Sequence, residues 1–127
     1  MIQGVGKVVV PVADQERAKR FWTQVLGFTV AVDEPYGDDE RWIEVTPPDK
    51  GVVLVLSRRA AGEARPEVPE MLPHSPVFFT CDDIQRTHQE LTARSVSFPT
   101  APTRMPFGWW ALFEDDEGTR YALQQRS

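Results

Sequence analysis

Residues 7–28 read KVVVPVADQERAKRFWTQVLGF and join a β-like run to an amphipathic helix. The apolar run at residues 7–12 predicts a strand, and Asp14 stands where a helix N-cap accepts a free backbone N–H group. Apolar side chains then recur with helical spacing, at Ala18, Phe21, Trp22, Val25 and Leu26. Gly27 ends this pattern, as glycine commonly does after a helix. We therefore expect a strand followed by a helix that packs on it.

The rest of the chain extends this unit and then repeats it. Three β-like runs follow at residues 28–32, 41–46 and 52–57, separated by turn-forming stretches, so the order is βαβββ. The order returns with a strand at 77–81, a cap at Asp82 or Asp83, a helix with Ile84, His88 and Leu91 on one face, and strands near 96–98, 109–114 and 119–124.

Equivalent features of the two copies are separated by nearly constant distances. Asp14 and Asp83 are 69 residues apart, Phe28 and Phe98 are 70 apart, and the runs that begin at Gly51 and Gly118 are 67 apart. Duplication of one supersecondary unit explains this spacing. We expect one α+β domain of two tandem βαβββ modules, at about residues 1–58 and 75–127, joined by a proline-bearing linker at about 59–74.

Length and composition narrow the class of protein. A chain of 127 residues with 41% hydrophobic side chains has room for one core. Its net charge of −5 does not attract it to nucleic acid or to an anionic membrane surface. No apolar run is long enough to span a bilayer and the first residues lack a signal peptide, so we expect a cytoplasmic protein. Cys81, the single cysteine, is expected to be a buried structural thiol.

Four segments of the chain carry a family resemblance. They are the strand end VPVAD at residues 10–14, the helix end with Leu26-Gly27-Phe28, the strand and cap FTCDDI at 79–84, and the hairpin FEDDEGTRYAL at 113–123. In this order they resemble the vicinal oxygen chelate superfamily, which includes glyoxalase I, bleomycin-resistance proteins and extradiol dioxygenases. The resemblance implies two curled sheets around a cavity and a homodimer. Members isomerise hemithioacetals, cleave catechol rings, alter fosfomycin or only sequester drugs, so the fold leaves the function open.

The resemblance also locates four positions where metal-using members carry ligands. In this chain those positions are Lys7, Pro76, Val55 and Ala122. A divalent ion needs several imidazoles, carboxylates or thiolates that converge on one point, which these residues do not provide. We therefore expect no metal and no other cofactor. His74 with Glu44 is the alternative, as a displaced metal site.

Residues expected to line the cavity are mostly apolar, with a few cations. The segment RMPFGWW at 104–110 resembles the aromatic turn of bleomycin-resistance proteins, with Phe107 in the place of the aromatic residue. If Trp109 and Trp110 lie on a strand they point to opposite faces, and Trp110 is favoured because it lies 68 residues after Trp42. The predicted ligand-binding set is Lys7, Trp42, Val55, Phe78, Arg104, Phe107, Trp110, Arg120 and Ala122.

Three functions follow as hypotheses. The leading one is a metal-independent, non-catalytic binder of a small apolar or aromatic organic molecule, such as a metabolite or antibiotic. The second is an enzyme of the same superfamily, a lyase, isomerase or dioxygenase-like protein, that uses Glu44, Lys7 or His74 as acid or base, or a displaced metal. The third is a structural or interaction module whose cavity is closed.

Overall fold

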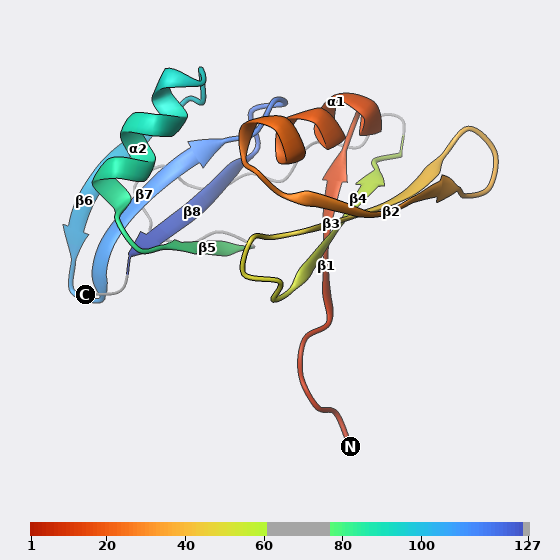
Figure 1. Ribbon diagram of the computed structural model, residues 1–127, viewed down its shortest axis with the longest axis horizontal. Coiled ribbons are helices and arrows are strands. Elements are labelled where there is room, and N and C mark those ends of the chain that lie inside the picture. The colour runs from red at the N-terminus through yellow and green to blue at the C-terminus, as the bar shows by residue number, and fades with distance from the viewer. Residues whose placement is uncertain (61–76, 126–127) are drawn as a thin grey trace. The chain divides into compact units, whose positions relative to one another are not determined.

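The computed structural model describes residues 1–60 and 77–125, and the chain divides into two compact units at residues 1–65 and 66–127. We call these units module one and module two. Each consists of a four-stranded sheet and one helical segment, in the order βαβββ (Figure 1). The predicted α+β class and the doubled βαβββ unit are therefore confirmed.

Module one contains the elements that residues 7–57 predicted, with small shifts at their ends. They are β1 (Lys7–Val12), α1 (Gln15–Arg20), its π-helical continuation η1 (Phe21–Val25), β2 (Thr29–Pro35), β3 (Arg41–Thr46) and β4 (Val53–Arg58). The strand order in the sheet is β1-β4-β3-β2. β1 runs parallel to β4, and the other neighbours are antiparallel. Gly27, at a φ of 82°, ends the helical segment as expected.

Module two repeats this topology. Its elements are β5 (Phe78–Cys81), α2 (Ile84–Ala93), β6 (Thr100–Met105), β7 (Gly108–Glu114) and β8 (Arg120–Gln125), in the sheet order β5-β8-β7-β6. Both helices begin at the predicted type of cap. Asp14 accepts a hydrogen bond from the backbone N–H of Arg17 at 3.0 Å, and Asp83 accepts one from Arg86 at 3.1 Å. Of the two predicted caps, Asp82 and Asp83, the structure selects Asp83.

One strand prediction is wrong. Residues 96–98 form no strand, and the corresponding strand β6 lies at Thr100–Met105. The backbone N–H of Val96 instead donates to the carbonyl of Leu91 at 3.0 Å, which closes the end of α2. β6 is the edge strand of its sheet, a position that tolerates the missing N–H of Pro102.

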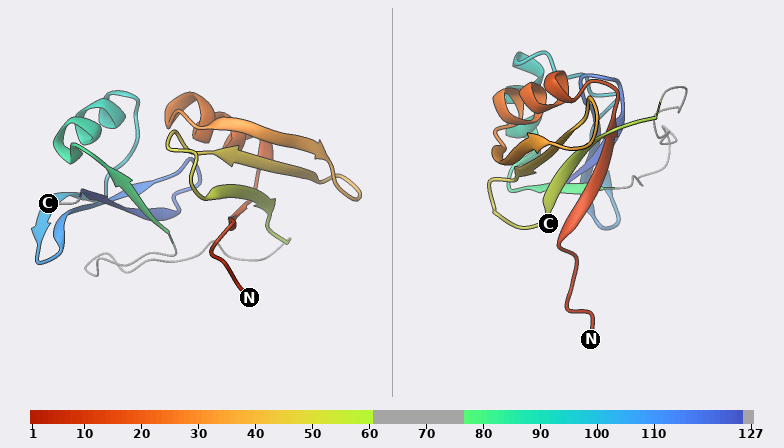
Figure 2. Two further views of the ribbon diagram at one scale, coloured as in Figure 1. Left: turned by 60° about the horizontal axis from the view of Figure 1, so that its bottom comes forward. Right: turned by 90° about the vertical axis from the view of Figure 1, so that its right-hand side faces the viewer.

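Each sheet has one face covered by its own helix and one face that this helix leaves free (Figure 2). In module one, Val10 and Val12 of β1 are buried on the covered face, together with Ala18 and Trp22 of the helical segment. In module two the covered face holds an aromatic cluster of Phe79, Phe98, Phe113 and Tyr121. We call the opposite face of each sheet its helix-free face. Because side chains alternate along strands, it carries Lys7, Val9, Trp42, Glu44, Val53 and Val55 in module one, and Phe78, Met105, Trp110, Leu112, Arg120 and Ala122 in module two.

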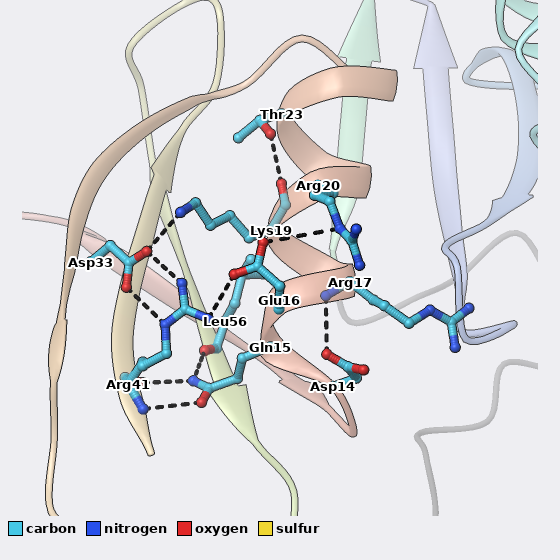
Figure 3. Close-up of polar contacts among 10 residues, drawn as sticks. All are labelled: Asp14, Gln15, Glu16, Arg17, Lys19, Arg20, Thr23, Asp33, Arg41 and Leu56. Atoms are coloured by element: carbon cyan, nitrogen blue, oxygen red, sulfur yellow. Dashed lines mark hydrogen bonds and ion pairs between the residues drawn. The ribbon is translucent and has the colours of Figure 1, made fainter. Parts of the chain in front are cut away.

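A polar network fastens α1 to its sheet (Figure 3). The buried side chain of Gln15 donates to the carbonyls of Arg41 and Leu56, at 2.6 and 2.8 Å, and accepts from the N–H of Arg41. Beside it, the guanidinium of Arg41 makes a two-point contact with Asp33, at 3.0 and 2.6 Å. Lys19 adds a third hydrogen bond to Asp33 at 2.8 Å. The amide and the ion pairs together tie the helix to β2, β3 and β4.

The surroundings of Cys81 agree with the expected structural thiol. Cys81 is partly buried, its thiol donates to the carbonyl of Gln124 at 3.8 Å, and burial raises its pKa, all of which fits a structural role.

Among the residues that the structure describes, neither helix has the length and apolar character needed to cross a bilayer.

The Arg41–Asp33 pair makes stability depend on pH. Hydrogen bonds from Arg41, and then from Lys19, lower the pKa of Asp33 from 3.8 to about 2. Because the folded-state pKa lies below the ordinary value, the stabilisation is complete above pH 3.8 and is lost as the pH falls toward 2. We expect Asp33→Asn to lower the free energy of unfolding by about 1–2 kcal/mol near neutral pH, allowing for partial exposure of the pair.

Urea denaturation of both proteins at neutral and acidic pH measures this difference. Asp38→Asn, at an exposed position in the β2–β3 turn, is the matched control and should change little at either pH. A destabilisation by Asp33→Asn that persists undiminished near pH 2 would contradict the assignment.

Candidate functional site

Strand pairing in module one brings Lys7, Trp42, Glu44 and Val55 onto one face. Lys7 and Val9 of β1 are opposite Val53 and Val55 of β4, and Val55 is also opposite Glu44 of β3. Trp42 precedes Glu44 by two residues and therefore shares its face. Predicted residues that are far apart in the sequence thus form one cluster on the helix-free face.

Glu44 is the centre of this cluster. Its Oε2 atom accepts a hydrogen bond from Lys7 Nζ at 2.6 Å and another from Trp42 Nε1 at 2.7 Å. The residue is 8% exposed, whereas the side chain of Lys7 is 52% exposed. The hydrogen bond from Lys7, followed by that from Trp42, lowers the pKa of Glu44 against the opposing effect of burial. Glu44 is therefore a carboxylate with two donors on one oxygen, which stabilises its charged form.

Aromatic rings extend the cluster. The Nζ atom of Lys7 lies 5.9 Å from the centroid of the Trp42 ring, within the range of a cation–π contact. The ring of Tyr36 lies 5.3 Å from that of Trp42, at a tilt of 58°. Tyr36 was not among the predicted site residues, because it falls in the turn between two predicted strands. The sequence feature that could have identified Tyr36 is the predicted hairpin, because it returns the chain from Tyr36 to the strand that carries Trp42.

The helix-free face of module two is more apolar. Trp110, Leu112 and Ala122 form a buried cluster, and Met105 packs against it. Phe78, opposite Ala122, is 40% exposed. Arg120 lies on the same face, where its Nε atom is 3.4 Å from a carboxylate oxygen of Glu114. Met105 was quoted in the aromatic segment but not predicted as a site residue. A two-residue turn pairs it with Gly108 and so puts it on the face of Trp110.

The structure settles which of the adjacent tryptophans lies on this face. Trp110 is on the helix-free face and is 4% exposed, while Trp109 points to the opposite side. Arg104 is opposite Trp109, and its guanidinium carbon lies 5.9 Å from the ring centroid of Trp109. Within module two, Arg104 therefore lies on the opposite side of the sheet from the predicted residues Trp110 and Ala122.

Two further predicted residues are Phe107 and His74. Phe107 is in the β6–β7 turn and is 41% exposed. His74, the candidate acid, base or displaced metal ligand, lies outside the described residues. Pro76, one of the four positions that the resemblance assigns to metal ligands, lies outside them as well.

The described residues do not fit a metal ion. Lys7 and Val55 in module one, and Ala122 in module two, stand at positions that the resemblance assigns to metal ligands, and none of these three side chains is a suitable ligand. Glu44, which is opposite Val55 in the sheet, is already engaged by Lys7 and Trp42. Within residues 1–60 and 77–125, no three His, Cys, Asp or Glu side chains are grouped so that they could hold an ion.

The coupling of Glu44 to Lys7 is measurable through Trp42. The indole N–H resonance of Trp42 should titrate with the carboxylate, with a midpoint below 4.5 because the folded-state pKa is lowered. We expect Lys7→Met to raise this midpoint, since it removes the largest cause of the shift. Lys50→Met, in the exposed turn before β4, is the control and should leave the midpoint in place. An unchanged midpoint in Lys7→Met would refute the ion pair as the source of the shift.

Comparisons with known proteins agree with the fold and the resemblance. A sequence model of the Glyoxalase/Bleomycin resistance protein/Dioxygenase superfamily matches residues 4–123. The uncharacterized protein YetH of Bacillus subtilis (strain 168) is 32% identical over 125 residues, covering 98% of this chain and 100% of YetH. A solved member of the superfamily from Sphaerobacter thermophilus DSM 20745 has a TM-score of 0.84 at 26% identity, with 98% of both chains covered. TnmS3, an antibiotic binding protein from Streptomyces sp. CB03234, has a TM-score of 0.80 at 32% identity, covering 99% of this chain and 98% of TnmS3. The chain therefore belongs to the Glyoxalase/Bleomycin resistance protein/Dioxygenase superfamily.

Proposed function

We propose that this chain is a metal-independent binder of a small apolar or aromatic organic molecule, for which the helix-free face of each module offers contacts. The observation that carries the proposal is the closed Lys7–Glu44–Trp42 cluster, at a place where metal-using relatives are expected to have ligands. The cluster offers an indole and a neutralised ion pair rather than a coordination site. The similarity to TnmS3 over nearly the whole chain also supports a binding function, because TnmS3 is an antibiotic binding protein.

The chemistry of the two faces suits an aromatic ligand. Trp42 and Tyr36 supply aromatic rings in module one, and Trp110 with Met105 belongs to a buried apolar cluster in module two. Indole and phenol rings bind flat molecules well, because they give much contact area and lose little conformational entropy. The exposed half of Lys7 adds one positive group beside these rings.

The state of Glu44 argues against its use as a general base. A base is effective near neutral pH when its pKa lies close to that pH. The hydrogen bonds from Lys7 and Trp42 move the pKa of Glu44 in the opposite direction. Lys7 is in turn paired with this carboxylate at 2.6 Å, so the two groups are engaged with each other. The described acid–base candidates are therefore better suited to positioning than to catalysis.

Binding without turnover is the expected outcome for flat aromatic compounds. We expect 9-fluorenone and flat aromatic antibiotics to bind saturably, unaffected by a chelator, with no product in mass spectra. Trp42→Ala should weaken binding about tenfold, as loss of a stacking contact implies. Trp109→Ala is the matched control, because Trp109 lies on the opposite side of its sheet. Conversion of any of these compounds to a product would contradict the proposal in favour of an enzyme.

We also propose that the chain acts as a homodimer. β1 and β5 are equivalent edge strands of their sheets, and their residues Val9 and Phe78 are 58% and 40% exposed. Edge strands and apolar side chains of this kind are used in association between chains. Sedimentation should give twice the chain mass, and Val9→Glu should shift it toward the monomer. Val52→Glu, at a 38% exposed turn position, serves as the control. A monomeric mass for the unmodified protein would exclude the dimer.

A further inference from the structure

Trp110 has a buried hydrogen-bond donor whose acceptor is not found in the described residues. The side chain is 4% exposed, and its Nε1 atom is buried without a partner in residues 1–60 and 77–125. Its cluster neighbours Leu112, Ala122 and Met105 offer no oxygen or nitrogen from their side chains. A buried N–H without an acceptor is unfavourable, so such groups in folded proteins usually serve a purpose.

The duplicated fold supplies an internal comparison. Glu44 is opposite Val55 in module one, and Leu112 is opposite Ala122 in module two. Counting back two residues from each makes Trp42 and Trp110 structurally equivalent. The N–H of Trp42 donates to Glu44 at 2.7 Å, but the equivalent of Glu44 is Leu112, which cannot accept. The two modules therefore hold equivalent indoles in two states: the donor of Trp42 is occupied, and the buried donor of Trp110 is unpaired within the described residues.

The polar side chains opposite Trp110 on the two adjacent strands do not accept a hydrogen bond from its indole N–H either. Thr103 of β6 and Gln124 of β8 are opposite Trp110. The hydroxyl of Thr103 donates to the carbonyl of Ala101 at 2.9 Å, and neither side chain accepts from the indole. The side chains of Thr103 and Gln124 therefore leave the indole N–H of Trp110 without an acceptor.

We propose that the indole N–H of Trp110 donates a hydrogen bond to an uncharged acceptor of the bound molecule, a carbonyl or ether oxygen on an otherwise aromatic or apolar body. This inference rests on the proposed binding function and names the ligand class. The acceptor is neutral because Leu112, Ala122 and Met105 would desolvate an anion. Arg120, the cation on this face, is already paired with Glu114 at 3.4 Å.

A matched pair of planar probes tests the donor directly. 9-Fluorenone and fluorene have the same tricyclic shape, and only the ketone carries an acceptor. The full chain labelled with ¹⁵N gives one indole N–H resonance for each of its 4 tryptophans, assigned through Trp42→Phe, Trp109→Phe and Trp110→Phe. We expect fluorenone to move the Trp110 proton downfield and fluorene to leave it near its free position. Fluorenone should also bind about tenfold more tightly, as one hydrogen bond implies.

The substitutions extend the test to affinity. Trp110→Phe should reduce the affinity for fluorenone to that for fluorene, while Trp109→Phe should preserve the difference. If Trp110→Phe fails to fold, the resonance of the unmodified protein remains decisive. Equal affinities for the two probes with an unmoved Trp110 proton would overturn this inference and leave the binding function intact. A free-state Trp110 proton as far downfield as that of Trp42 would also overturn it, because the donor would already be used. Absence of saturable binding by either probe or by the antibiotics would overturn both proposals.

Discussion

The parallel pairing of the first and last strands in each module fixes which side chains share a face. In module one it sets Val9 beside Val55, and the antiparallel neighbour adds Glu44 to the same row. In module two the equivalent pairing sets Phe78 beside Ala122, next to Leu112. A slip of one residue would exchange the covered and helix-free faces, because side chains alternate along a strand. The helix caps and the polar network around Gln15 and Arg41 support this register by fastening α1 across the strands.

The two modules share a backbone plan and differ in chemistry. At one equivalent position, a carboxylate in module one gathers Lys7 and Trp42 into a polar cluster. A leucine at that position in module two leaves an apolar surface around an indole donor. Duplication followed by divergence thus gives two faces of unlike character from one fold.

Local patterns predicted the architecture well, and strand registers limited the prediction of the site. Both N-caps and the doubled βαβββ order follow from local sequence features, namely aspartates before helical patterns and a repeated order of elements. The position of β6 was not predictable from composition, because Val96 and Phe98 favour a strand while residues 100–105 contain Pro102. The backbone N–H of Val96 is instead used at the end of α2. The strand β6 that was not predicted places Arg104 opposite Trp109. Trp42 and Trp110, which are 68 residues apart, lie at equivalent positions on the two helix-free faces, whereas the engagement of Glu44 by two donors required the folded geometry.

Whether the protein works by binding rather than by metal-dependent chemistry is tested most directly on the protein as purified. Elemental analysis combined with native mass spectrometry reports metal content and bound organic molecules together. The closed Lys7–Glu44–Trp42 cluster predicts a chain without a stoichiometric transition metal that still takes up an aromatic ligand. A stoichiometric zinc, nickel, iron or manganese ion whose removal also abolishes ligand binding would contradict the account.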